Sequence, residues 1–575
     1  MNSIRKIYSI FDKRQKKQFS ILVFFSILTM ILETFSVSLI IPLLNSFLNN
    51  DNFFLVNILK FFFPLNFLSK TNIIIILISF FILVFLIKTI FIIYYTLYKN
   101  KFVYSLRSGI SSRIFSNVLN VNYSFHVKTN SSIIINILTK EIEEMVSLID
   151  SGITFFTEFL VIVGLFLLII FYEPVNIIAI IFLSFFAISI YQITKKQVSK
   201  WGVARQEHEQ SRILHINQSI DGIKEIKIAK LENNFFSRFE HHNNKSAKIG
   251  RYMTTLSQVP RVLLEFFGLV TIFLIVIFFS YIGKSTSDII AILGILVVTS
   301  FRILPSMNRT LGTVQQLRYA KPVVDLIHYY TLSNIFQKKN EVQNLLRLNF
   351  EKKLEVKNIS FSYSDKNESS IEILKNINFS VNKGDFIGVV GKTGSGKTTL
   401  MNILLGLLDP TEGDIFLDDK SILKNISSWQ SIVGYVPQGI FLIDDTIKNN
   451  IILNDENFNL ENYNKALIDS ELDTFINSLS LKSETNIGER GIKISGGQKQ
   501  RIGLARVLYK NPSVIILDEA TSALDIATEK KIIDTMKSLI PSKTIIAVSH
   551  RLDTLKNCNK VFILENKKFK ILNDK

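Results

Sequence analysis

Residues 386–408 read FIGVVGKTGSGKTTLMNILLGLL, and this stretch decides the fold of the C-terminal part of the chain. It joins an apolar strand to an apolar helix through a loop that matches the GxxxxGK[ST] pattern. Glycines let backbone N–H groups wrap a phosphate, while Lys397 supplies a cation and Thr398 a hydroxyl for Mg²⁺. The pattern predicts an α/β nucleotide-binding domain whose loop contacts ATP through Gly391, Lys392, Thr393, Gly394, Ser395, Gly396, Lys397, Thr398 and Thr399.

A second apolar strand, VIILDE at residues 514–519, ends in two carboxylates. Asp518 is suited to hold Mg²⁺, and Glu519 is suited to polarise an attacking water. On their own, two acids at the end of a strand would indicate only a solvated turn. Downstream of a phosphate-binding loop, they predict the centre of an ATPase.

Further short motifs follow in a fixed order around these two strands. VGYVPQ ends at Gln438, ISGGQ spans 494–498, SALD ends at Asp525, and His550 follows the apolar strand TIIAVS. Tyr363 ends the segment SFSY ahead of the loop. Together these motifs resemble the ATP-binding cassette (ABC) family, with Ile494 in place of the usual leucine.

The resemblance implies a mechanism in which two chains enclose two ATP molecules. The phosphate loop of one chain would face the ISGGQ segment of the other, and Gln438 and His550 would act with Glu519 in hydrolysis. The implied Mg²⁺ ligands are Thr398, Gln438 and Asp518. The implied nucleotide contacts outside the phosphate loop are Tyr363, Ser495, Gly496, Gly497, Gln498 and Asp525. Because Glu519 and His550 are both present, a homodimer would have two competent sites.

The N-terminal half of the 575-residue chain carries six apolar runs long enough to span a membrane. They lie at about 19–45, 71–98, 147–172, 175–194, 259–283 and 287–307. We predict an all-α six-helix transmembrane domain at residues 1–315, a linker at 316–350 and the α/β ATPase domain at 351–575. The single cysteine, Cys558, excludes a disulfide framework and a cysteine-based zinc site.

The net charge of +18 follows the membrane topology rather than a nucleic-acid site. Residues 1–18, 99–146 and 195–258 hold 24 Lys and Arg, whereas the segments on the other face hold three. This asymmetry places both termini, both long loops and the ATPase domain in the cytoplasm of a multi-pass inner-membrane protein. No nucleic-acid-binding motif accompanies the charge, so nucleic acid is not an expected partner.

The two long polar segments, 99–146 and 195–258, mix apolar and charged residues without proline, which favours helical extensions of the spans. Fusion of such a membrane domain to the ATPase resembles the exporter branch of the family. NVNYSFHV within 119–127 and SIDGIKEIK at 219–227 are candidate coupling segments, with ordinary loop structure as the alternative. The segment 486–491, NIGERG, resembles the part of exporter ATPases that contacts coupling helices. Residues 46–70 are compatible with a short interfacial helix on the other face.

Four basic residues inside or near the spans are candidates for a substrate cavity, because ionisable groups in a membrane are costly and often functional. They are Lys88, Arg261, Arg302 and Arg309. Basic groups in the cytoplasmic half of a cavity suit an anionic lipid head group. The alternatives are that Arg261 pairs with Glu265 one turn away, that Lys88 and Arg309 reach the interface, and that Glu33 is a structural hydrogen-bonding residue.

Three membrane segments resemble PglK-type flippases, which move lipid-linked oligosaccharides across the bacterial inner membrane for protein N-glycosylation. These segments are LETFSVSLIIP at 32–42, QVPRVLLEFFG at 258–268 and FRILPSMNR at 301–309. The resemblance implies an ATP-driven flippase for an anionic lipid-linked oligosaccharide. The alternative transport functions are export of a lipid A-like lipid, a drug or a peptide.

Two other classes of protein fit the sequence less well. A soluble cassette ATPase acting on DNA or ribosomes does not explain six apolar runs with a strong charge asymmetry. An ATP-gated channel or regulatory subunit does not require the intact Glu519.

Overall fold

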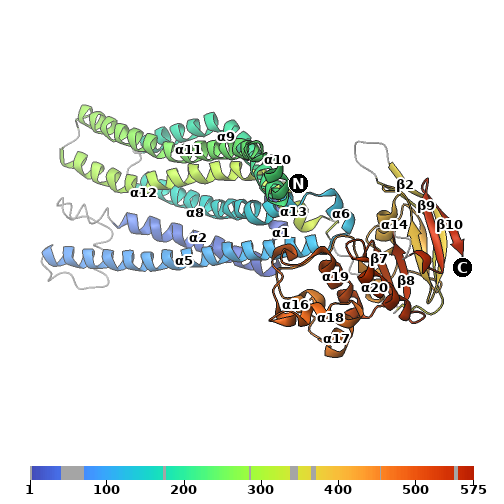
Figure 1. Ribbon diagram of the computed structural model, residues 1–575. Helices are drawn as coiled ribbons and strands as arrows, with labels where there is room; N and C mark the ends of the chain where they lie inside the picture. The colour runs from blue at the N-terminus through green and yellow to red at the C-terminus, as the bar shows by residue number, and fades with distance from the viewer. Residues whose placement is uncertain are drawn as a thin grey trace. The chain divides into compact units, whose positions relative to one another are not determined.

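The computed structural model describes residues 3–39, 70–172, 177–283, 286–333, 335–336, 348–363, 371–453, 455–549 and 555–574 (Figure 1). The chain forms two compact units. The first contains residues 1–121 and 126–338, and the second contains residues 339–575 together with 122–125. The division into 1–315, 316–350 and 351–575 remains a prediction.

The first unit is built from long helices that run side by side (Figure 1). The helices between residues 3 and 332 are α1 (Ser3–Ile10), α2 (Lys13–Ser38), α5 (Lys70–Asn120), α6 (Tyr123–Lys128), α7 (Ser131–Asn136), α8 (Ile142–Tyr172), α9 (Ile177–Asp221), α10 (Ile223–Ala229), α11 (Glu232–Tyr281), α12 (Thr286–Tyr319) and α13 (Lys321–Leu332). A π-helical turn, Ile137–Glu141, joins α7 to α8. The predicted helical extensions of the spans are therefore present in α5, α8, α9 and α11.

The membrane part of this unit has its own apolar core. Buried residues of α2, α8, α9, α11 and α12 form one cluster, which includes Val37, Leu165, Ala187, Leu264 and Ile303. Many other large apolar side chains on these helices remain exposed, as expected for surfaces that face lipid. The expected fold class, a helical membrane domain fused to an α/β domain, is confirmed.

The predicted number of six spans is not confirmed. Within the described residues, four helices are long and apolar enough to cross a membrane: Lys13–Ser38, Ile78–Asn120, Ser131–Ile170 and Glu232–Tyr281. Helices α9 and α12 occupy the positions of the fourth and sixth predicted spans, 175–194 and 287–307. The predicted interfacial segment 46–70 lies almost wholly outside the described residues.

A close helix–helix contact fixes α9 against the end of α12. A Cβ atom added at Gly202 would lie 2.1 Å from the backbone oxygen of Tyr319, so only glycine permits this approach. Around it, Val198, Ile249 and Tyr319 form a small buried cluster. The contact sets the spacing of the two helices where they leave the membrane part of the unit.

We expect Gly202→Ala to destabilise the first unit by about 1–3 kcal/mol, because the helix backbones must separate to accept one methyl group. The loss exceeds the gain of up to about 1 kcal/mol that alanine brings to a helix interior. Apparent Tm of the detergent-solubilised protein measures the effect. Gly250→Ala on α11 is the matched control, since its Cβ would meet no atom within 4 Å. Equal behaviour of the two variants would contradict the close contact.

The second unit contains a four-stranded and a six-stranded sheet. Their orders are β2-β1-β4-β5, which is antiparallel, and β10-β9-β3-β8-β7-β6, in which all strands but β10 run parallel. The strands are β1 (Lys353–Tyr363), β2 (Ile371–Asn382), β3 (Phe386–Val390), β4 (Glu412–Leu417), β5 (Lys420–Ser421), β6 (Val433–Val436), β7 (Val514–Asp518), β8 (Thr544–Val548), β9 (Lys560–Glu565) and β10 (Lys568–Asp574).

Helices and the second sheet cover both faces of the six-stranded sheet. The helices are α14 (Lys397–Leu404), α15 (Ile426–Ile432), α16 (Ile447–Ile452), α17 (Leu460–Asp469), α18 (Asp473–Asn477), α19 (Gly496–Lys510) and α20 (Ile526–Ser538). One core joins α14 to both sheets, and a second core joins α19 and α20 to the opposite face. Strands β3, β7 and β8 are therefore almost fully buried, which explains their continuous apolar sequences.

Candidate functional site

The phosphate-binding loop lies where β3 ends and α14 begins. Gly394 and Gly396 have φ angles of +81° and +102°, which other residues rarely adopt. A side chain at Gly391 would meet the Leu564 backbone oxygen at 2.6 Å. The glycines are thus required by the loop conformation and by close packing, independently of any ligand.

Lys397 is buried at the base of this loop. Its Nζ donates to the backbone oxygens of Gly391 and Lys392 at 2.7 and 3.1 Å. The ammonium group therefore lies within the turn of the loop, beside the N-terminus of α14, and both features favour an anion at this position.

The two acids predicted at the end of β7 lie next to a glutamine from another segment. Gln438 Nε2 donates to Glu519 Oε2 at 2.7 Å, although the two residues are 81 positions apart. Glu519 has a φ angle of +52°, and its N–H donates to the Val548 oxygen at 3.0 Å. The structure thereby brings Gln438 and Glu519 together, and their roles in hydrolysis remain a prediction.

Asp518, the residue before Glu519, is buried and contacts Tyr435. Burial raises the pKa of Asp518, and the charge of Glu519 raises it further. Tyr435 donates to Asp518 Oδ2 at 3.3 Å, and burial together with the Asp518 charge raises the pKa of the tyrosine. A cation at this carboxylate would offset both unfavourable effects.

Gln500 is a positioning residue that the sequence analysis did not single out. Its Nε2 donates to Ser522 Oγ at 3.0 Å and lies 3.4 Å from the Glu519 backbone oxygen. Its Oε1 accepts from the Ala523 N–H at 2.9 Å. One buried amide thus connects α19 to the segment that follows Glu519. The sequence shows a glutamine two residues after Gln498, but it cannot show which groups that side chain contacts.

The ISGGQ residues form an exposed helix N-terminus. Ser495 caps α19: its Oγ accepts from the Gln498 N–H at 3.3 Å, and Gln498 Oε1 accepts from the Ser495 N–H at 2.8 Å. Ser495 and Gly496 are exposed, and Gly497 lies against Ala523. An exposed N-terminus of this kind can accept a phosphate brought by another molecule.

Three other residues were predicted to take part in the ATPase site: Asp525, Tyr363 and His550. Asp525 caps α20, with its Oδ1 accepting from the Thr528 N–H at 2.9 Å, and these backbone contacts lower the pKa of Asp525. Tyr363 ends β1 and its ring packs edge-on against Phe361. His550 lies outside the described residues.

In the first unit, Glu33 lies between two of the predicted cavity residues. Its Oε2 is 3.1 Å from Lys88 Nζ and its Oε1 is 2.9 Å from Arg302 Nη2. Lys88 also donates to Ser36 Oγ at 3.2 Å. The carboxylate is nearly fully buried, and three helices, α2, α5 and α12, contribute to the cluster. Two cations share one anion, so the cluster carries a net positive charge.

Arg309 and Arg261 have acidic partners of different kinds. Arg309 Nη1 lies 2.6 Å from Oε1 of Glu158, a buried residue of α8 that the sequence analysis did not include. Glu158 Oε2 is buried without a hydrogen-bond partner. Arg261 pairs with Glu265 one turn away at 2.9 Å, and both side chains are exposed.

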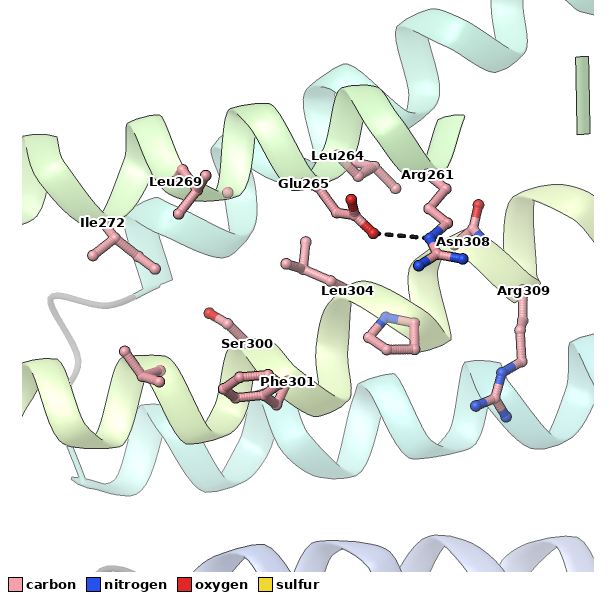
Figure 2. Close-up of a pocket in the computed structure, with 13 residues that line it drawn as sticks. Arg261, Leu264, Glu265, Leu269, Ile272, Ser300, Phe301, Leu304, Asn308 and Arg309 are labelled. Carbon is pink, nitrogen blue, oxygen red and sulfur yellow. Dashed lines mark hydrogen bonds and ion pairs between the residues drawn. The ribbon is translucent and has the colours of Figure 1, made fainter. Parts of the chain in front are cut away.

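A groove of about 730 Å³ brings Arg261 and Arg309 to one surface between α11 and α12. Figure 2 shows the Arg261–Glu265 pair projecting into this space, while Arg309 turns towards the lower helix. The remaining lining is mainly apolar and includes Leu264, Phe301 and Leu304. The structure therefore divides the four predicted cavity residues between the Glu33 cluster and this groove.

Comparison with known protein families gives two matches. Residues 374–522 match the ABC transporter model, and residues 19–303 match the ABC transporter transmembrane region. The fold is that of a bacterial Atm1-family ABC exporter solved with ATP bound, with a TM-score of 0.76 and 18% identity over 96% of this chain and 94% of that one.

Two curated relatives match most of this chain. An ATP-dependent lipid A-core flippase of Syntrophus aciditrophicus is 26% identical over 80% of this chain and 75% of its own length. The protein of the same name from Photorhabdus laumondii is 28% identical over 79% and 78%. The chain binds ATP and couples its hydrolysis to transport as a multi-pass membrane protein. It therefore belongs to the ABC transporters, as an exporter-type half-transporter with one membrane domain and one ATPase domain.

Proposed function

We propose that this half-transporter works as a homodimer that flips an anionic lipid, a lipid-linked oligosaccharide, across the bacterial inner membrane. The observation that carries the proposal is the Glu33 cluster, in which Lys88 and Arg302 share one buried carboxylate. Buried charges in a membrane are costly unless they are compensated, and one carboxylate compensates only one of these two cations. A phosphate or pyrophosphate head group supplies the missing negative charge.

The proposed roles in the ATPase site follow the sequence motifs of the second unit, and the Gln438–Glu519 contact supports two of them. Glu519 polarises the attacking water, Gln438 positions it, and His550 contacts the γ-phosphate. Thr398, Gln438 and Asp518 would hold Mg²⁺, because they offer an all-oxygen donor set of the kind this ion prefers. The raised pKa of the buried Asp518 fits a carboxylate that is completed by a cation. The Mg²⁺ ion would neutralise charge on the transferred phosphate.

Dimerisation is proposed because the ISGGQ helix N-terminus is exposed. Ser495 and its neighbours would bind the γ-phosphate held by the phosphate loop of the partner chain. A coupling role for 119–127 and 219–227 belongs to the same proposal. The excess of Lys and Arg in 99–146 and 195–258 supports a cytoplasmic ATPase domain.

A lipid A-like lipid is the second candidate cargo. It is favoured by the two relatives named lipid A-core flippases. Their identities of 26% and 28% leave room for a different head group. Both candidate lipids carry phosphate, so the Glu33 cluster suits either one.

ATP-driven flipping in proteoliposomes tests the proposal. We expect Arg302→Ala to reduce movement of a polyprenyl-pyrophosphate oligosaccharide at least about tenfold while ATP hydrolysis persists, because loss of a charged contact is worth roughly 1.5–3 kcal/mol. Arg107→Ala is the matched control, since Arg107 forms an exposed pair with Glu143 in the helical extension.

The lipid arms of the same assay separate the candidates. Faster flipping of a phosphorylated lipid A precursor than of the pyrophosphate oligosaccharide would select the second cargo. Equal flipping of a neutral glycolipid, or an Arg302→Ala variant that flips normally, would refute a charge-selective cavity.

A further inference from the structure

A second charged groove lies apart from both sites described above. It has a volume of about 550 Å³ and is formed by α9 and by the last turns of α12. Its lining contains four cations and one acid, together with two small apolar residues and a serine. The cations are Lys195, Lys196, Lys200 and Arg318, and the acid is Glu207. None of them belongs to the ATPase motifs or to the predicted substrate cavity.

The groove begins where the apolar part of α9 ends. The predicted fourth span ends at residue 194, and Lys195 and Lys196 follow immediately. Arg318 Nε donates to Tyr191 Oη at 2.7 Å, and its guanidinium lies 5.0 Å from the centre of the same ring. This contact places Arg318 level with the last turn of the predicted fourth span. Basic pockets at this depth meet the phosphate layer of a bilayer.

An exposed apolar stripe on α9 leads into the groove. Ile181, Phe185 and Ile188 are about 60% exposed and follow one another at spacings of four and three residues. Continuing this spacing along the helix reaches Lys195 and Lys196, and Lys200 follows Lys196 by one turn. The surface is therefore apolar along the predicted span and basic at its end, which complements an anionic lipid with apolar chains and a negatively charged head group.

The cations of this groove differ from those of the Glu33 cluster in their partners. Across the described ranges, Lys196, Lys200 and Arg318 form no ion pair with an acidic side chain, whereas Lys88 and Arg302 both pair with Glu33. The Gly202–Tyr319 contact fixes the two helices beside them. The charges are thus held close together on a rigid support with one acid, Glu207, near them.

We propose that this groove binds the phosphate of an anionic glycerophospholipid from the cytoplasmic leaflet, with its acyl chains along the exposed stripe of α9. Lys196, Lys200 and Arg318 hold the phosphate, and Tyr191 positions Arg318. The proposal rests on the proposed orientation in the membrane and does not depend on the identity of the transported lipid. The bound lipid is a boundary lipid of the transporter rather than its cargo.

Lipid retention by the full-length protein tests this site. The protein is placed in phosphatidylcholine nanodiscs that contain increasing fractions of phosphatidylglycerol. The protein is then released from the nanodisc, and the lipid that stays bound to it is measured by native mass spectrometry. We expect Lys196→Gln with Lys200→Gln to weaken phosphatidylglycerol retention by about fivefold for each charge removed. Retention by the unchanged protein should also fall as ionic strength rises.

Two further variants and a second lipid serve as controls in this experiment. Lys245→Gln with Lys248→Gln removes equal charge from exposed positions on α11 and should retain phosphatidylglycerol normally. Lys196→Arg with Lys200→Arg keeps the charge and should bind like the unchanged protein. The proposal is overturned if the groove variant, Lys196→Gln with Lys200→Gln, and the α11 control variant lose phosphatidylglycerol to the same extent. It is also overturned if polyprenyl pyrophosphate, but not phosphatidylglycerol, is retained.

Discussion

Replacing Glu519 by glutamine is expected to lower the rate of ATP hydrolysis by roughly 10²–10⁴-fold, the usual contribution of a general base. Glutamine keeps the shape of the side chain but cannot take a proton from water. Because glutamine is closest to glutamate in size and shape, the substitution should least disturb the backbone at position 519, with φ at +52°, and the contact with Gln438. Steady-state phosphate release from the purified, reconstituted protein measures the change.

Measuring ATP affinity distinguishes a variant that has lost only the hydrolytic step from one whose nucleotide-binding site is disrupted. We expect Glu519→Gln to bind ATP with normal affinity, because Lys397 and the phosphate loop are unchanged. Glu461→Gln, at an exposed position on α17, is the matched control and should hydrolyse ATP at the normal rate. A Glu519→Gln variant with more than a tenth of normal turnover would exclude Glu519 as the general base.

Replacing Glu141 by alanine is expected to destabilise the first unit by about 3–5 kcal/mol, because it leaves a buried arginine without its partner. Glu141 is fully buried in the π-helical turn before α8 and accepts from Arg205 Nη2 at 3.0 Å and Nη1 at 3.3 Å. Asn136 Nδ2 lies 3.2 Å from the same carboxylate. The loss should appear as a large fall in the apparent Tm of the detergent-solubilised protein.

An exposed ion pair between α8 and α5 provides the control. Glu143 pairs with Arg107 at 2.5 Å, but both side chains are nearly half exposed, so Glu143→Ala should cost at most about 1 kcal/mol. Replacing Glu141 and Arg205 together by leucine should be less damaging than Glu141→Ala, since Arg205 is then not left buried without Glu141. If Glu141→Ala and Glu143→Ala shift the apparent Tm equally, burial does not control the strength of this pair.

The membrane charges show how far a cavity can be predicted from sequence. The sequence indicated Lys88 and Arg302 because a cation in an apolar run is conspicuous in any single segment. The alternative for Glu33, a structural hydrogen-bonding role, did not anticipate that one carboxylate would bind both cations. Glu158, the partner of Arg309, was missed although it lies in the third predicted span.

The sequence by itself determined the two-part architecture and the ATPase motifs. Spanning length and hydropathy are properties of contiguous residues, and the phosphate loop is a local conformation that its own glycines impose. Motifs such as VIILDE and ISGGQ also carry their strand or helix with them, so their order along the chain sufficed to identify the family.

Only the tertiary structure decided which distant residues meet. Gln438 reaches Glu519, Gln500 connects α19 to the segment after β7, and Gly202 allows α9 to approach α12. The basic groove likewise exists because Arg318 is brought beside Lys196 and Lys200. Local periodicity cannot specify such pairings, because they depend on how helices and strands pack against one another across large separations in sequence.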